Sequence, residues 1–160
     1  MSFLAATIGM GPVFDPANPL SLSPDKLAWY QGKLKPDTLI DMNQIHQQCV
    51  LGAITPNAAV KALCCMLINS CYEIAKPHND KSPEFEFFRH LRNAASHRNH
   101  FTFFPREPSC PTAWSGFSID HTKKGTMNPL ANTECVGLLV SPGDILALLH
   151  EIELKLPKVV

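Results

Sequence analysis

The spacing of apolar side chains predicts a chain built mainly from helices. Ser23 and Pro24 form a cap and first-turn pair, which predicts a short helix ending at Gly32. A longer helix is expected from about Pro36 to Gly52, because four apolar residues recur there at intervals of three and four: Leu39, Met42, Ile45 and Cys49. Residues 58–75 are apolar almost all the way round, which is typical of a central buried helix.

Two further helices are expected in the second half of the chain. One begins at Ser82 and Pro83 and runs to about Asn99, and the last is capped by Ser141, Pro142 and Asp144 and is ended by Pro157. The last helix carries its apolar residues on one face: Ile145, Leu148, Leu149, Ile152 and Leu156.

Prolines and chain length set the domain organisation. A chain of 160 residues fits one domain, which we predict over residues 23–160. Residues 1–22 contain three prolines and no helical period, which predicts an extended or irregular arm. Residues 102–135 are also proline-rich, and we expect there a long insertion with a hairpin in which Phe117 and Ile119 alternate before a turn near Lys124 and Gly125.

Composition excludes several classes of protein. With 45% hydrophobic and 18% charged residues the chain is too apolar to be disordered, and we expect no apolar run long enough to cross a bilayer. The formal net charge of zero argues against a basic coat for nucleic acid over the whole protein. Residues 81–110 are an exception, since they hold five basic and three acidic residues together with His90, His97 and His100.

The six cysteines predict a reducing compartment. They form no CxxC pair, and three of them lie in the apolar run 62–74, which suits buried thiols in a cytoplasmic protein. Residues 3–13 lack a basic start and contain two glycines and a proline, so we expect no signal peptide. A zinc site is the alternative that the histidines raise, but their spacing has no HxxxH or HExxH pattern, and we predict neither a metal nor a cofactor.

The predicted helix 85–99 has an apolar stripe and an opposite polar arc. On a helical wheel the arc holds seven side chains: Arg92, Ser96, Arg89, Asn93, Glu86, His97 and His90. Asn93 and His97 lie about 40° apart and are surface neighbours, whereas Arg92 and His97 lie about 140° apart. Arg92 and His97 therefore cannot touch on one helix, but they can meet across two such helices related by a two-fold axis.

The run from Arg92 through Asn93 to His97 matches the motif of the HEPN superfamily. The surrounding stretch FRHLRNAASHRNHF, residues 88–101, resembles the wider signature of bacterial HEPN proteins, and the helical layout over residues 36–156 is similar. The resemblance implies an all-α antiparallel bundle of about four to five helices. It also implies a metal-independent endoribonuclease whose active site forms between two identical chains. The insertion 102–135 departs from the minimal fold.

The residue types suit RNA cleavage, in which a ribose 2′-OH attacks the adjacent phosphate. Histidine can exchange a proton near neutral pH, and the fork of arginine can hold phosphate oxygens. We therefore assign His97 as general acid/base, Arg92 as phosphate and transition-state stabiliser, and Asn93 as the residue that orients one of them. Further contacts to the substrate are assigned to Arg89, Ser96, Arg98 and His100.

Other interpretations of the same residues stay open. Arg92 can cover the apolar stripe with its stem, and His97 can cap the helix carbonyls. A non-catalytic HEPN-like module that binds RNA or nucleotide, or a dimeric scaffold, is the main alternative to the enzyme. A toxin silenced by a protein antitoxin is compatible with the enzyme.

Overall fold

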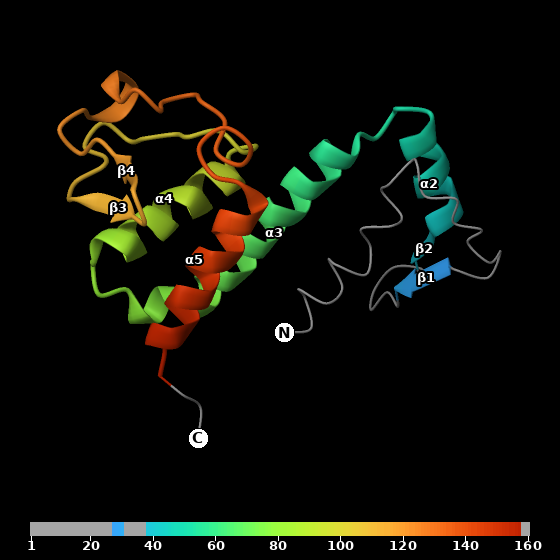
Figure 1. Ribbon diagram of the computed structural model, residues 1–160, viewed down its shortest axis with the longest axis horizontal. Helices are drawn as coiled ribbons and strands as arrows, with labels where there is room; N and C mark the ends of the chain where they lie inside the picture. The colour runs from blue at the N-terminus through green and yellow to red at the C-terminus, as the bar shows by residue number, and fades with distance from the viewer. Residues whose placement is uncertain (1–26, 31–37, 158–160) are drawn as a thin grey trace. The chain divides into compact units, whose positions relative to one another are not determined.

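The computed structural model describes residues 27–30 and 38–157 and divides the chain into two compact units, residues 1–60 and 61–160 (Figure 1). In the first unit, strand β1 (Leu27–Tyr30) pairs antiparallel with β2 (Thr38–Asp41), and α2 (Met42–Val50) follows directly. Gly52, with a φ of +72°, lies just after α2, where the sequence predicts the helix to end. The predicted arm, residues 1–22, and the cap pair Ser23–Pro24 lie outside the described residues.

Two helix predictions in this unit are wrong. Residues 27–30, expected in a helix, form β1, and the helix expected from Pro36 begins only at Met42 because residues 38–41 form β2. The strands read LAWY and TLID, in which aromatic and β-branched residues favour extended backbone. The apolar spacing that predicts Leu39 to lie in a helix therefore extends over two elements, the strand β2 and the helix α2 that follows it.

The second unit begins within α3 (Pro56–Ala75) and contains α4 (Pro83–Ser96), the strands β3 (Thr112–Trp114) and β4 (Phe117–Ile119), and α5 (Pro142–Lys155). Short 3-10 helices lie at Lys76–His78 and Gly125–Met127. Among the described residues the chain is mostly helical, as the sequence predicts, and β3–β4 is the hairpin expected within residues 102–135; the hairpin β1–β2 is not among the predicted elements.

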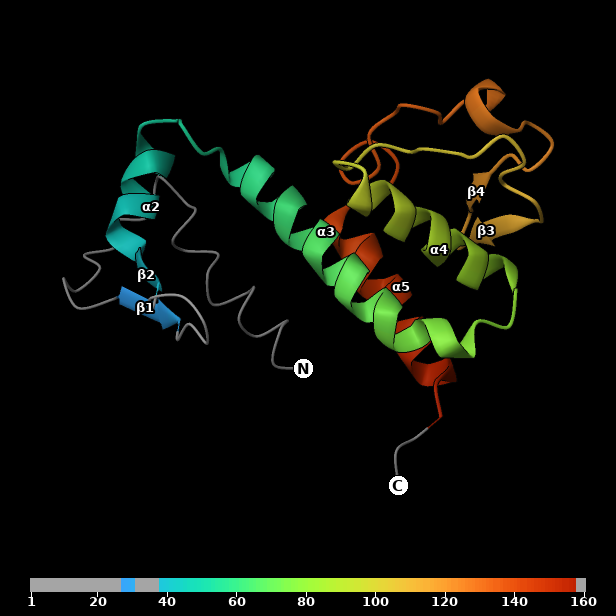
Figure 2. The same cartoon turned by 180° about the vertical axis from the view of Figure 1, so that it is seen from behind.

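Helix α4 is the centre of the second unit. The hairpin β3–β4 lies on one side of it, and α3 and α5 lie on the other (Figures 1 and 2). Tyr72 of α3 packs edge-on to Phe88 with ring centroids 5.3 Å apart. On the opposite side, Phe87 stacks on Trp114 at 6.2 Å and on Phe117 at 6.1 Å. Burying each such aromatic ring stabilises the fold by roughly 1.5–3 kcal/mol.

The segment expected as an insertion, residues 102–135, belongs to this core. Phe103, Trp114 and Ile119 within it are buried. The strand predicted around Phe117 and Ile119 is confirmed as β4. The turn is at Ser115 and Gly116, whose positive φ values suit a tight two-residue hairpin, and not near Lys124 and Gly125, where a 3-10 helix lies.

Helix α3 is not the central buried helix that its composition predicts. Few of its apolar residues are buried, and Met66 and Ile74 are 55% and 70% exposed. The helical stretch Asn57–His78 is long and apolar enough to cross a membrane by length and composition, with 28% of its most apolar window buried, contrary to our expectation that no such run exists. Core helices of soluble proteins also meet this criterion, so it assigns no membrane by itself.

The cap of α5 is confirmed in detail. The Ser141 hydroxyl accepts a hydrogen bond from the Asp144 backbone N–H, and the Asp144 carboxylate accepts one from the Ser141 backbone N–H at 2.8 Å. Ile145, Leu148 and Ile152 of the predicted apolar face are buried.

Candidate functional site

The carboxyl end of α4 carries most of the predicted site residues. The helix ends at Ser96, three residues earlier than predicted, and His97 follows as its C-cap residue. Arg98 and Asn99 then have φ values of +58° and +66°, a left-handed conformation that asparagine tolerates better than most residues. These two residues stop the helix and turn the chain away from it.

Asn99 holds this turn through its side chain. Its amide oxygen accepts from the Val136 backbone N–H at 2.8 Å, and its amide nitrogen donates to the Val136 carbonyl at 3.0 Å and to Glu134 at 3.2 Å. Glu134 also pairs with Lys61 of α3 at 2.7 Å. The backbone after His97 is therefore fixed to two other parts of the second unit.

Arg92 is directed to α3. Its Nη2 donates to the Glu73 carboxylate at 2.8 Å, and its guanidinium lies over the Tyr72 ring, 5.5 Å from the centroid. Its Nε is buried and has no hydrogen-bond partner in the described part of the chain. Arg92 is therefore ordered by α3 while a third of its side chain stays exposed.

The other predicted site residues lie either against α3 or at the turn that follows α4. Ser96 donates to Asn69 of α3 at 2.8 Å, and the half-buried Asn93 accepts the backbone N–H of His97 at 3.1 Å through its carbonyl. His97 and His100 are exposed; His100 is held by a 2.9 Å contact between its Nδ1 and the Arg98 carbonyl. The imidazole of His97 contacts no other polar group among the described residues.

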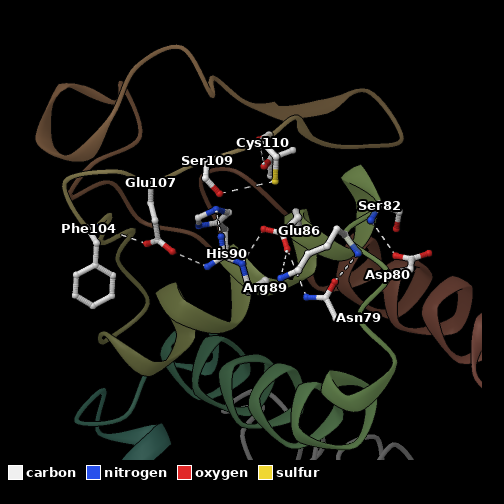
Figure 3. A network of polar contacts seen from close by, with 12 residues as sticks. Asn79, Asp80, Ser82, Glu86, Arg89, His90, Phe104, Glu107, Ser109 and Cys110 are labelled. Carbon is white, nitrogen blue, oxygen red and sulfur yellow. Dashed lines mark hydrogen bonds and ion pairs between the residues drawn. The ribbon is translucent and has the colours of Figure 1, made fainter.

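Arg89 lies apart from this turn, in a buried charged cluster that Figure 3 shows. Its Nε donates to Glu86 at 2.8 Å and its Nη1 to Glu107 at 2.6 Å, while its Nη2 lies 2.9 Å from the His90 Nε2. Two carboxylates engage its guanidinium, so the structure gives it a structural role in place of the predicted phosphate contact.

The predicted polar arc is wrong at Glu86 and His90, whose exposed fractions are 2% and 1%. The wheel placed these residues opposite the apolar stripe and therefore in solvent. The segment after α4 covers them instead, with the Phe103 ring 5.3 Å from the His90 ring. Helix α4 is thus packed on two faces.

The cluster fixes the protonation of His90. Because arginine can only donate, the His90 Nε2 accepts and the proton lies on Nδ1, which is buried without a partner among the described residues. Burial, together with the charge of Arg89, lowers the pKa of His90 to about 4. Burial raises the pKa of Glu86, but the hydrogen bond and charge of Arg89 outweigh this and hold it below its ordinary value.

This pKa predicts a pH-dependent stability. Between the unfolded pKa of His90, about 6.5, and the folded value of about 4, the unfolded chain binds a proton that the folded chain does not. The contribution of His90 to the free energy of unfolding is therefore fully present above pH 6.5. It is lost as the pH drops toward 4, which lowers the free energy of unfolding by about 3 kcal/mol. Urea unfolding at pH 7.5, 6 and 5 measures the slope. His90→Phe, which keeps the ring against Phe103, is expected to flatten it between pH 6.5 and 5, and an unchanged slope would contradict the assignment.

Metal and thiol chemistry receive no support from the geometry. In residues 27–30 and 38–157, no group of three or more His, Cys, Asp or Glu side chains lies in a position to hold a metal ion. All six cysteines are free thiols, and burial raises the pKa of four of them, which keeps them in the unreactive protonated form: Cys64, Cys65, Cys71 and Cys135.

No known protein family, curated protein or solved structure matches this chain. The resemblance to the HEPN superfamily is therefore carried by its own residues, 88–101 above all. The geometry adds that the motif residues lie on one end of α4, with Arg92 and Ser96 bound to α3 and His97 in solvent.

Several cations without a carboxylate partner lie in the segment of the chain that follows α4, a pattern that the charge count alone indicates only in part. Arg98, Arg106 and Lys123 have no carboxylate within 4 Å in the described structure, and Lys124 donates to the Pro108 carbonyl. Each of the other described lysines and arginines pairs with a carboxylate: Lys61, Lys76, Lys81, Arg89, Arg92 and Lys155. The uncompensated positive charge therefore lies between residues 98 and 124.

Proposed function

We propose that the chain is a metal-independent endoribonuclease of HEPN type that acts as a pair of identical chains. The observation that carries this proposal is the position of His97. Its imidazole is exposed and unbound at the end of α4, next to Arg98, which has no carboxylate within 4 Å in the described structure. A proton-exchanging group beside uncompensated positive charge suits a phosphodiester substrate.

The proposed chemistry assigns one task to each residue. His97 takes the proton of the attacking 2′-OH or gives a proton to the leaving oxygen. Arg92 stabilises the charge that develops on the phosphate; Glu73 engages only its Nη2, so Nη1 can donate to a phosphate oxygen. Asn93, one helical turn before His97, orients the phosphate or the imidazole. Arg98 and His100 contact neighbouring phosphates, and Ser96 supports them through its bond to Asn69.

Two chains are needed because Arg92 turns toward α3 whereas His97 lies at the end of α4. The exposed apolar residues Met66 and Ile74 lie on the same helix as Glu73, the partner of Arg92. Pairing two copies through this face of α3 buries apolar surface next to Arg92. The His97 of one chain then completes the site with the Arg92 of the other.

One observation favours a second candidate, an RNA-binding module or dimeric scaffold without catalysis. Glu73 already neutralises Arg92 in the structure, as a purely structural arginine would require. Under either candidate we propose a cytoplasmic protein with RNA as its ligand. A protein antitoxin that covers His97 is the partner we propose for the nuclease.

Mixing two inactive variants tests the shared site. Arg92→Ala and His97→Ala chains, each alone, are expected to leave labelled RNA uncut in EDTA. When they are mixed, unfolded and refolded together, about half of the pairs are mixed and each contains one intact site, so about a quarter of the wild-type activity returns. No recovery from the mixture means that the site is not shared between chains, and no cleavage by the wild type favours the binding module.

A further inference from the structure

The segment that follows α4 runs back along that helix (Figure 2), and alternate side chains in it are exposed. It is held at one end by the bridge between His100 and Glu134, and at the other by the pair of Glu107 and Arg89. Phe101 and Phe103 are buried, and their rings stack 5.8 Å apart, whereas Thr102 and Phe104 are exposed. The residues that point outward therefore form a row that starts at His97 and ends at Arg106.

Phe104 has an exposed ring on a fixed backbone. Its side chain is 65% exposed, although its backbone is held twice by Glu107: the Glu107 N–H donates to the Phe104 carbonyl at 2.8 Å, and the Phe104 N–H donates to the Glu107 carboxylate at 3.3 Å. Gly125 braces the same turn, since a Cβ there would lie 3.3 Å from the Pro105 Cα. Little conformational entropy remains to be lost when a flat ligand stacks on this ring.

Charge around Phe104 favours an anionic ligand. Arg106 lies two residues away and has no carboxylate within 4 Å in the described structure. Lys123, two residues before the bracing Gly125, has none within 4 Å either, although its charge helps to lower the pKa of Asp120. Of the carboxylates between residues 98 and 135, Glu107 and Glu134 are paired with cations, and Asp120 is bound by Thr122. An exposed aromatic ring among unpaired cations is the arrangement that binds single-stranded nucleic acid.

We propose that a single RNA strand lies along residues 97–106, with Phe104 stacked on one base and Arg98, Arg106 and Lys123 at its phosphates. The row spans about 30 Å if it is fully extended. This inference rests on the proposed function and adds to it a base contact, at Phe104, away from His97. A duplex, whose bases are stacked within the helix, cannot place one of them on Phe104.

Binding of a fluorescent single-stranded RNA twelve-mer to the full chain, measured by anisotropy in EDTA, tests the proposal. His97→Ala serves as the parent so that cleavage does not interfere. Phe104→Ala is expected to raise the Kd about tenfold, and Phe104→Trp to keep it. Arg106→Gln is expected to weaken binding less and to lower the salt dependence by about one phosphate contact. Leu154→Ala, which changes a similarly exposed apolar residue on α5, is the matched control and is expected to change nothing.

Two results overturn the proposal. If Phe104→Ala binds the RNA as its parent does, no base stacks on the ring. If Phe104→Leu binds as tightly as its parent, apolar contact suffices and the surface fits a protein partner better than RNA. Cleavage of a dinucleotide by the wild-type chain tests the nuclease without the Phe104 contact, because this substrate is too short to reach Phe104 from His97. A chain that binds RNA through Phe104 but cleaves none contradicts only the nuclease.

Discussion

Replacing His97 by alanine is expected to lower the rate of RNA cleavage by about 10²–10⁴-fold, the usual contribution of a positioned acid/base group. The fold is expected to persist, because the imidazole is exposed and the cap bonds at this position come from the backbone N–H of His97 to the carbonyls of Asn93 and Ala94. A surface change of this kind alters the free energy of unfolding by about 0.5 kcal/mol or less. Single-turnover cleavage of a labelled RNA in EDTA measures the loss.

His150→Ala is the matched control for this variant. His150 is also exposed, but it lies on α5, and its nearest charged partner is Glu153 at 3.9 Å. The His150→Ala variant is expected to cleave RNA at the wild-type rate. The assignment of His97 is contradicted if both variants cleave equally, and a loss of RNA affinity that parallels the loss of cleavage would point to binding in place of proton transfer.

Helix α5 illustrates what local sequence can predict. Its cap, its apolar face and its end at Pro157 depend on residues within one helix, so side-chain chemistry and periodicity suffice. The same holds for the end of α2 near Gly52. In these two cases the interacting residues lie close in the chain, and the predictions agree with the structure.

Helix α4 illustrates what local sequence cannot predict. The wheel identified Phe87, Phe88 and Leu91 as core, and they are buried. It placed Glu86 and His90 in solvent because it assumed one packed face. The second face is created by residues 101–119, and no periodicity within α4 indicates that a distant segment covers a glutamate and a histidine.

The candidate site likewise combines a local feature that the sequence predicts with distant contacts that it does not. The motif predicted that Arg92, Asn93 and His97 share the end of a helix, which the structure confirms. The contacts of Arg92 with Glu73 and of Asn99 with Val136 join residues 19 and 37 positions apart, and the spacing of the motif does not indicate either of them. Phe104 was grouped with the insertion because its neighbouring prolines exclude regular helix, although the alternation in the run FTFF carries a signal for one exposed edge.

The buried cluster links stability to the proposed RNA surface. Glu107 joins Arg89 of α4 to the turn that holds Phe104, so one carboxylate serves both the core and the exposed ring. A change in the cluster is therefore expected to loosen residues 104–107 before the helices separate. This coupling makes Arg89 the most sensitive charged position in the second unit.

Replacing Arg89 by methionine is expected to destabilise the fold by about 3–5 kcal/mol, because it leaves two carboxylates at a buried site without their cation. Glu86 is 2% exposed, and its remaining partners are Asn79 at 3.4 Å and the distant Lys81 at 3.8 Å. Urea unfolding at pH 7.5, followed by circular dichroism, measures the loss. A loss of this size is a large part of the free energy of unfolding of an ordinary domain.

Two matched variants separate the lost charge from the lost side chain. Arg92→Met removes an arginine of the same helix whose partner Glu73 is half exposed, so the expected loss is about 1 kcal/mol or less. Adding Glu86→Gln and Glu107→Gln to Arg89→Met removes the uncompensated charges and is expected to recover most of the stability, because the penalty comes from unpaired buried charge. If the triple variant is no more stable than Arg89→Met, the cost lies in packing around the arginine stem, and the cluster is not held together by its charges.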